Sequence, residues 1–184
     1  MTYKNQKSIK LHDKEFVAFI DNLKMEKAIK ELADRMSTEL SEEQIVFLCI
    51  LNGSFMFAGE LFKHFENVCH ISFVKLSSYS GTATTGDVKE IIGLNESIEG
   101  KTVVVVEDIV DTGETIEKLY HTLMKKQPKQ VKIATMLFKP DAYRKDIPID
   151  YIAINIPNKF VVGFGLDYNG YGRNLKHLYQ IIEP

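Results

Sequence analysis

The fold is decided by one stretch, Val103-Val104-Val105-Val106-Glu107-Asp108-Ile109-Val110-Asp111-Thr112-Gly113-Glu114-Thr115. Its run of valines predicts a strand buried on both faces, as in a parallel sheet. A helix should follow, because the next apolar residues have the spacing of one helix face: Ile116, Leu119, Tyr120 and Leu123. A strand, a short polar turn and a helix N-terminus form an anion site, since free backbone N–H groups and the positive end of the helix dipole face the turn.

Acidic residues crowd this turn, although they would repel a phosphate group. The conflict disappears if the phosphate binds backbone amides and the hydroxyl groups of Thr112 and Thr115, while the acids serve another part of the same ligand. A ribose fits this description. Glu107 and Asp108 can accept hydrogen bonds from its vicinal hydroxyls, and their negative charge would stabilise a developing ribosyl cation.

Three other loop types do not fit the spacing. A Walker loop ends in Gly-Lys-Ser/Thr, which is absent here. A dinucleotide-binding loop needs three glycines, and this stretch has Gly113 alone. An EF-hand needs oxygen ligands at alternate positions, but Ile109 and Val110 stand in the middle. An ordinary acidic turn that caps a helix remains the alternative without a function.

The residues from Glu107 to Gly113 resemble the phosphoribosyl pyrophosphate signature of the type I phosphoribosyltransferases, in the form most similar to the family's hypoxanthine-guanine members. The resemblance extends from about Ile45 to the C-terminus. It implies an α/β fold with a mostly parallel central sheet flanked by helices, and a small hood. It also implies purine salvage, in which 5-phosphoribosyl is transferred to N9 of hypoxanthine or guanine and IMP or GMP and pyrophosphate are released.

Composition limits the class of protein. The 184 residues suit one domain spanning residues 1–184, and a hydrophobic content of 45% is enough for a core. A net charge of -2 argues against nucleic acid as a partner. No apolar run approaches membrane-spanning length and residues 1–6 open no signal peptide, so we expect a cytoplasmic protein without a membrane partner. Cys49 and Cys69 are expected to be buried thiols rather than a disulfide.

Strands that alternate with helices independently indicate an α/β fold. Expected strands span residues 16–20, 45–51, 71–75, 131–138 and 151–156. Asp21 or Asn22 should cap a first helix and Ser54 a second. The predicted inward faces of these helices are Met25, Ile29, Leu32, Met36 and Leu40 in the first, and Ala58, Leu61, Phe62 and Phe65 in the second.

Two further loops gain a function through the resemblance. Asn52 and Gly53 end a predicted buried strand, and the matching family loop offers backbone amides to pyrophosphate; its first residue is often Lys or Arg, where this chain has Asn52. The polar segment 77–87 is similar to the family's mobile catalytic loop, and Ser78 and Tyr79 match its Ser-Tyr pair. Closure of such a loop would keep water away from a ribosyl cation.

The remaining site residues are also implied by the resemblance. Asp111 would be the general base toward N7, Lys139 the donor to the purine O6, and Arg173 a pyrophosphate contact. Phe160 would stack on the purine, with Lys159 before it and the Val161 backbone reading the base edge. Glu114 replaces a lysine of some relatives in the phosphate loop. The residues expected to bind the 5-phosphate are Asp111, Thr112, Gly113, Glu114 and Thr115.

Magnesium is the implied cofactor, because hard oxygen ligands and retained waters suit Mg²⁺. Asp167 would lie beside the magnesium pyrophosphate, with Glu107 and Asp108 as further oxygen ligands. By analogy with relatives we expect a homo-oligomer, a dimer or a tetramer. Two alternatives stay open: a phosphoribosyltransferase for another base, such as xanthine, adenine or uracil, and a regulatory module on this fold that binds nucleic acid. The acidic charge balance argues against the second.

Overall fold

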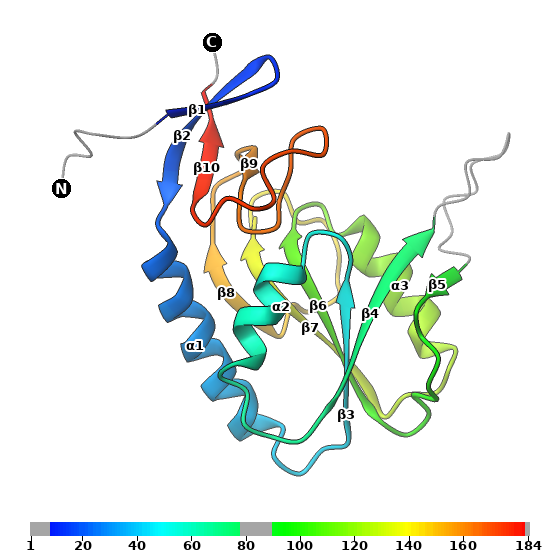
Figure 1. Cartoon of the computed structure of the whole chain (residues 1–184). Helices are drawn as coiled ribbons and strands as arrows, with labels where there is room; N and C mark the ends of the chain where they lie inside the picture. The colour runs from blue at the N-terminus through cyan, green and yellow to red at the C-terminus, as the bar shows by residue number, and fades with distance from the viewer. Residues whose placement is uncertain (1–7, 78–89, 183–184) are drawn as a thin grey trace, which may run out of the picture.

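The computed structural model describes residues 8–77 and 90–182, which form two β-sheets and three helices (Figure 1). The larger sheet has the strand order β5-β4-β3-β6-β7-β8. Its strands are β3 (Ile45–Ile50), β4 (His70–Ser77), β5 (Glu90–Ile92), β6 (Thr102–Val110), β7 (Gln130–Phe138) and β8 (Tyr151–Asn155). Only the β4–β5 pair among these is antiparallel. The predicted mostly parallel α/β fold is therefore confirmed.

β6 occupies the middle of this sheet, between β3 and β7. Its valines are all buried, as their sequence predicts. The strand does not end at the two acids that follow: it continues to Val110, and Glu107 pairs with Thr135 of β7. Glu107 and Asp108 are thus fixed by a ladder of hydrogen bonds rather than by a loop.

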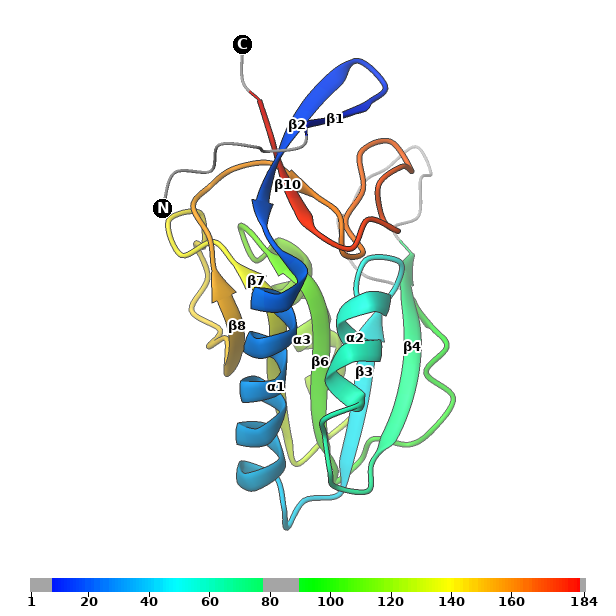
Figure 2. The same cartoon turned by 60° about the vertical axis from the view of Figure 1, so that its left-hand side comes forward.

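Helices cover both faces of the sheet, α1 (Asn22–Glu39) and α2 (Phe55–Phe62) on one side and α3 (Glu114–Met124) on the other (Figures 1 and 2). Alternate residues of each strand supply the two cores, because successive side chains of a strand point to opposite faces. Phe47 and Val104 pack with α1 and α2, whereas Val46 and Val103 pack with α3. The continuous apolar runs seen in the sequence follow from this two-sided burial.

The predicted helix ends and thiols agree only in part with the structure. Asp21 caps α1, and its Oδ1 accepts a hydrogen bond from Lys24 N at 2.9 Å. Ser54 occupies the N-cap position of α2, but the predicted capping bond is wrong: its buried hydroxyl has no hydrogen-bond partner within residues 8–77 and 90–182. Both cysteines are free, as predicted; Cys49 is buried but Cys69 is partly exposed, because Cys69 lies at the sheet margin just before β4 begins.

The second sheet is a hood over the carboxyl ends of the parallel strands (Figures 1 and 2). Its order is β1-β2-β10-β9, from β1 (Ser8–Leu11), β2 (Lys14–Ile20), β9 (Val161–Val162) and β10 (Leu178–Ile181). Its small core holds Phe16, Val162 and Tyr179. The strand predicted at 16–20 exists, but it pairs with β1 and β10 and not with the central sheet. In the described part of the chain, no helix has the length and apolar character needed to span a membrane.

Candidate active site

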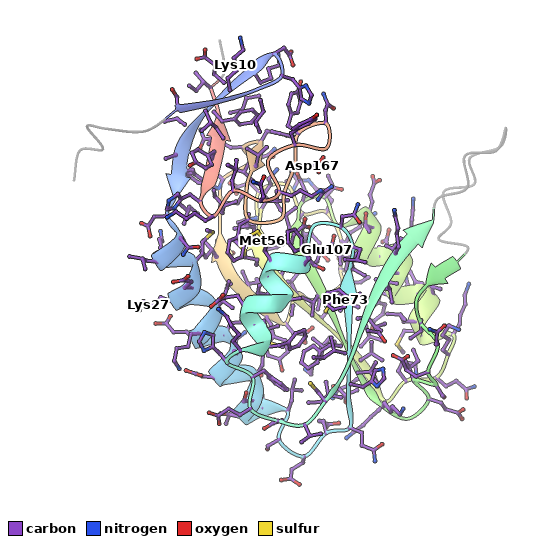
Figure 3. All side chains as sticks on the ribbon, viewed as in Figure 1. Lys10, Lys27, Met56, Phe73, Glu107 and Asp167 are labelled. Atoms are coloured by element: carbon purple, nitrogen blue, oxygen red, sulfur yellow. The ribbon has the colours of Figure 1, made fainter. Side chains whose placement is uncertain are left out.

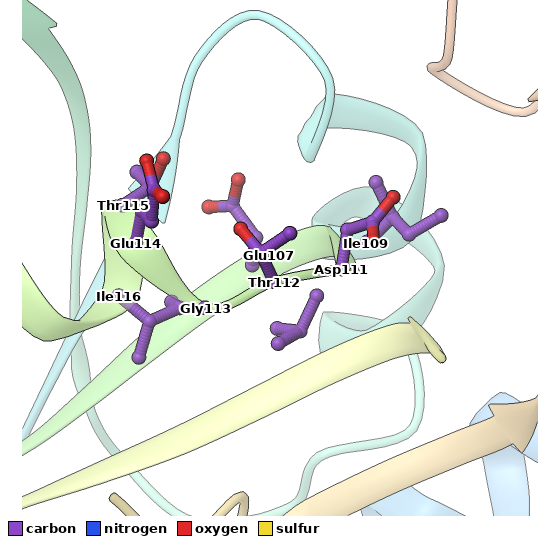
Figure 4. A pocket seen from close by; sticks show the side chains of 9 residues that line it. Glu107, Ile109, Asp111, Thr112, Gly113, Glu114, Thr115 and Ile116 are labelled. Atoms are coloured by element: carbon purple, nitrogen blue, oxygen red, sulfur yellow. The ribbon is translucent and has the colours of Figure 1, made fainter. Parts of the chain in front are cut away.

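The loop after β6 borders a cavity of ≈ 100 Å³ (Figure 4). The cavity is lined by Glu107, Ile109, Val110, Asp111, Thr112, Gly113, Glu114, Thr115 and Ile116. α3 begins at Glu114, and its first intrahelical bond runs from Glu117 N to Gly113 O. The amides of Glu114, Thr115 and Ile116 therefore precede that bond and are available to an anion. The structure thus brings the five predicted phosphate-binding residues around one cavity.

Glu107 and Asp108 are buried carboxyl groups at the end of β6. Burial raises the pKa of Glu107 well above its usual value, and the charge of Asp108 raises it further. Glu107 Oε2 has no hydrogen-bond partner among the residues that the structure describes. Burial also raises the pKa of Asp108 to about 6, although Ile109 N donates to Asp108 Oδ1 at 2.8 Å and Arg173 supplies positive charge. A buried carboxylate without donors is costly. Vicinal ribose hydroxyls would supply the missing donors.

Asp111 and Lys139 form an ion pair beside the phosphate loop. Lys139 Nζ lies 2.6 Å from Asp111 Oδ2, and Lys139 is only 6% exposed. Lys139 follows β7 directly, and its backbone N donates to Val110 O at 3.0 Å, which holds it against the end of β6. A buried ammonium needs a partner, because removal from water without one is expensive. The sequence had indicated both residues, and the parallel pairing of β6 with β7 brings them together.

The loop after β3 lies against the acids of β6 and against the hood. A Cβ added at Gly53 would collide with the Asp108 carboxylate, and one added at Gly165 would collide with the carbonyl oxygen of Gly53. Both positions therefore need glycine for close approach. The peptide bond between Leu51 and Asn52 is cis, and Asn52 is exposed. Three segments that are distant in sequence meet at this point.

The hood contributes a second ion pair, between Arg173 and Asp167. Arg173 Nη2 lies 2.6 Å from Asp167 Oδ1, and Arg173 Nη1 donates to Gly165 O at 2.7 Å. Asp167 Oδ2 also accepts from Gly170 N at 2.7 Å. Figure 3 shows Asp167 on the hood loop and Glu107 at the end of the central sheet below it. The hood thus holds a carboxylate and a guanidinium over the carboxyl ends of the strands.

Three of the proposed purine-binding residues, Lys159, Phe160 and Val161, lie in or just before β9 of the hood. Phe160 is 46% exposed, and its ring packs against Phe16 and Tyr168, with ring centroids 6.3 Å and 5.9 Å away. Val161 is buried and pairs with β10, and Lys159 is half-buried. An exposed, laterally supported ring can stack on a base. Ser78 and Tyr79 lie outside the described residues.

Sequence reasoning missed Gly165, Tyr143 and Lys145. Gly165 touches the loop after β3, and the side chains of Tyr143 and Lys145 cover Gly113 in the phosphate loop. The spacing of Gly163 and Gly165 was a signal for close backbone approach. A tyrosine and a lysine shortly after a strand gave no comparable signal.

The carboxylates expected to hold magnesium have a chemistry that suits this ion. Within residues 8–77 and 90–182, no three His, Cys, Asp or Glu side chains converge on one metal position. Asp167 is held by Arg173, and Glu107 and Asp108 are buried beside each other. Carboxylates of this kind suit Mg²⁺, which keeps several waters and is commonly bound through substrate phosphates.

The sheet, the phosphate loop on a helix N-terminus and the buried acids define a class of protein that the comparisons identify. The chain matches the model of the phosphoribosyl transferase domain over residues 18–169, so it belongs to the phosphoribosyltransferase family. The hypoxanthine-guanine phosphoribosyltransferase of Aquifex aeolicus is 36% identical over 159 residues, 85% of this chain and 89% of that protein. The enzyme of that name from Streptococcus agalactiae is 39% identical over 150 residues, 81% of this chain and 83% of that protein.

Solved structures give the same result. The hypoxanthine phosphoribosyltransferase of Staphylococcus aureus has a TM-score of 0.82 to this chain at 35% identity, and the match covers 90% of both chains. The Trypanosoma cruzi hypoxanthine phosphoribosyl transferase has a TM-score of 0.80 at 30% identity and covers 95% of both. That structure concerns the role of its C-terminal region in oligomeric state and enzymatic activity.

Proposed function

We propose that this protein is a purine salvage enzyme that transfers 5-phosphoribosyl from phosphoribosyl pyrophosphate to N9 of hypoxanthine or guanine. The Asp111–Lys139 pair carries the proposal. On a 6-oxopurine, O6 and N7 are neighbouring edge atoms, so an ammonium can donate to O6 while a carboxylate 2.6 Å from it faces N7. The name of the Aquifex aeolicus relative supports both bases, and the name of the Staphylococcus aureus structure supports hypoxanthine.

The donor substrate would lie across the carboxyl ends of β3 and β6. Its 5-phosphate would bind the amides from Gly113 to Thr115 and the hydroxyls of Thr112 and Thr115. Its ribose hydroxyls would donate to the buried Glu107 and Asp108. Its pyrophosphate would meet the loop amides of Asn52 and Gly53 and the guanidinium of Arg173, which forms bidentate contacts with phosphate oxygens.

In the reaction, N9 attacks C1′ of the ribose as the bond from C1′ to the pyrophosphate oxygen breaks. Positive charge develops on the ribosyl ring, and the carboxyl oxygens of Glu107 and Asp108 at the end of β6 would stabilise it. Asp111 accepts the proton that the base loses at N7. Lys139 stabilises the negative charge that develops toward O6. In the free enzyme, the contact between Lys139 and Asp111 holds both side chains in place until the base separates them.

Magnesium is the proposed cofactor. Asp167 would hold it through oxygen, with Glu107 and Asp108 as further ligands. When bound, it neutralises and orients the leaving pyrophosphate. Arg173, already paired with Asp167, would add positive charge beside the same group.

Several wider features belong to the same proposal. The purine would stack on Phe160, with Lys159 and the Val161 backbone at its edge. Residues 1–184 would act as one domain, since strands from both ends of the chain form the hood. We expect a homo-oligomer, a dimer or a tetramer, by analogy with relatives. A cytoplasmic location agrees with two free cysteines.

One assay tests this function directly. The protein is incubated with Mg²⁺, phosphoribosyl pyrophosphate and each nucleobase in turn, and the nucleotide formed is identified. IMP from hypoxanthine, GMP from guanine, or both, is the expected product. A nucleotide from adenine, uracil or xanthine alone would contradict the assigned base, and pyrophosphate release without any nucleotide would contradict the transfer itself.

A further inference from the structure

The segment after β7, residues 139–149, folds back onto the phosphate loop. The Tyr143 ring packs edge-on against Phe138 at a centroid distance of 5.3 Å, and its hydroxyl donates to Ile147 O at 2.6 Å. Arg144 N donates to Thr112 O at 3.3 Å. The segment is thus tied to the loop that lines the cavity, while its first residue, Lys139, is tied to Asp111.

Gly113 is the point of closest contact. Its φ is 87°, in the left-handed region that favours glycine. A Cβ there would also collide with the Tyr143 ring and would lie 2.8 Å from Lys145 Cγ. The stem of Lys145 therefore covers the same residue whose neighbouring amides face the cavity, and its ammonium group is confined to the start of α3.

The charges at this helix start are unfavourable to a phosphate. Glu114 and Glu117 both lie in the first turn of α3, and Glu114 lines the cavity. Two carboxylates at this position counteract the attraction of the helix dipole for a phosphate dianion. Lys145 Nζ lies 2.7 Å from Glu117 Oε2, and the Lys145 side chain is 22% exposed. The hydrogen bond to Glu117, with the charges of Glu117 and Glu114, raises the pKa of Lys145, which keeps its ammonium charged.

Within the described residues, two other cations near this loop have partners outside the start of α3. Lys139 pairs with Asp111, and Arg144 Nη1 donates to the carbonyl oxygen of Tyr143 at 2.8 Å. Lys145, by contrast, donates a hydrogen bond to Glu117, an acid of the helix start itself. Lys145 therefore supplies positive charge at a helix start where Glu114 and Glu117 supply negative charge.

We propose that Lys145 is a positioning residue of the 5-phosphate subsite, which holds the loop at Gly113 and supplies the counter-charge that lets a phosphate monoester bind beside Glu114 and Glu117. The inference rests on the proposed function, because that function places a 5-phosphate in this cavity. The specificity it creates is for a sugar carrying a terminal phosphate rather than for the base or the pyrophosphate.

The test compares Lys145→Met, which keeps an unbranched stem over Gly113 without the charge, with Lys145→Arg, which keeps the charge. Lys126→Met, an exposed lysine beyond the other end of α3, is the matched control. Calorimetry measures binding of ribose 5-phosphate and of magnesium pyrophosphate, and kinetics give kcat and both KM values. Lys145→Met should weaken ribose 5-phosphate binding and raise the KM for phosphoribosyl pyrophosphate about tenfold, the effect of one charge at a partly buried helix terminus.

In the same variant, pyrophosphate binding, the purine KM and kcat should stay within about twofold of wild type. Lys145→Arg should recover most of the lost affinity, and added salt should shrink the difference between wild type and Lys145→Met. Unchanged ribose 5-phosphate binding in Lys145→Met, or equal losses in Met and Arg variants, would overturn the inference, since charge would then have no role.

A second variant keeps the inference testable if Lys145→Met does not fold. Glu117→Gln removes one acid that Lys145 offsets, so ribose 5-phosphate should bind more tightly than to wild type. Equal or weaker binding would overturn the charge-balance argument. These binding measurements need no turnover. A wild-type protein that forms no nucleotide would therefore refute the proposed function, while the ribose 5-phosphate series still decides the role of Lys145.

Discussion

Two ion pairs face the proposed site, and they are built differently. Lys139 and Asp111 stand at the end of the central sheet, where the lysine side chain is 8% exposed and the acid 45%. Arg173 and Asp167 stand in the hood with nearly equal exposures of 30% and 27%. Each pair is 2.6 Å apart. The first pair is held by a buried ammonium group, and the second by hydrogen bonds to the backbone of Gly165 and Gly170.

The difference separates two chemical tasks. Asp111 is the more exposed member of its pair. It can therefore separate from Lys139 and accept a proton from a base while it stays in contact with solvent. Asp167 and Arg173 also bond to Gly170 N and Gly165 O, so they keep their geometry when a polyanion arrives. We therefore assign proton transfer to the sheet pair and charge neutralisation to the hood pair.

Removal of magnesium should give the largest effect. It should abolish the step that involves the hood pair and pyrophosphate, and it should spare nucleotide binding. Dialysed enzyme should have no detectable transferase activity, and added Mg²⁺ should restore it fully, because the leaving pyrophosphate needs neutralisation. IMP binding, which involves no pyrophosphate, should persist without the metal in calorimetry. Stoichiometric zinc in the purified protein would contradict this view of a substrate-borne ion.

Asp111→Asn tests the sheet pair. The variant keeps an oxygen for Lys139 but loses basicity, so kcat should fall by about 10²–10⁴, the usual range for a general base. The KM for phosphoribosyl pyrophosphate should change little. Steady-state kinetics provide the measurement, and the exposed Asp141→Asn in the next turn is the control. A wild-type kcat in Asp111→Asn would remove this residue from the base role.

Asp108 lies at the end of β6, where the charges of Arg173 and Asp167 in the hood also act on it. Its protonation should make the free energy of unfolding depend on pH. Burial raises its pKa from 3.8 to about 6, so between those values the folded protein binds more protons than the unfolded chain. The free energy of unfolding should therefore fall as pH rises through this window, by about 3 kcal/mol from this group. Urea unfolding of wild type and Asp108→Asn at pH 4 and pH 7 measures it. A difference between the two proteins that is the same at both pH values would refute the assignment.

The smallest effect should come from the aromatic ring in the hood. Phe160→Ala removes one stacking contact, which is worth about 1–3 kcal/mol of binding free energy, and should raise the purine KM accordingly. The KM for phosphoribosyl pyrophosphate should move less, and Phe160→Tyr should restore the purine KM because it keeps the ring. If both KM values rose equally in Phe160→Ala, the hood would be misfolded and the stacking assignment would be withdrawn.

Most elements could be predicted because their signals are local. The valines of β6 and the inward faces of α1 and α3 follow from periodicity, which depends on residues a few positions apart. The hood shows the limit of such signals. β2 pairs with β10, whose residues lie about 160 positions later, for example Phe16 with Ile181. Short strands gain stability only when they pair with others, and no local pattern in the sequence indicates that β2 and β10 are partners.

The site divides in the same way. Sequence by itself determined the strand, the acidic turn and the helix N-terminus that we propose as an anion site, because these are consecutive residues with fixed backbone requirements. Tertiary structure alone decided the Lys139–Asp111 pair, the raised pKa of Asp108, and the contact of Lys145 with the phosphate loop. Each of these depends on which side chains share a buried space, and desolvation and charge act through space rather than along the chain.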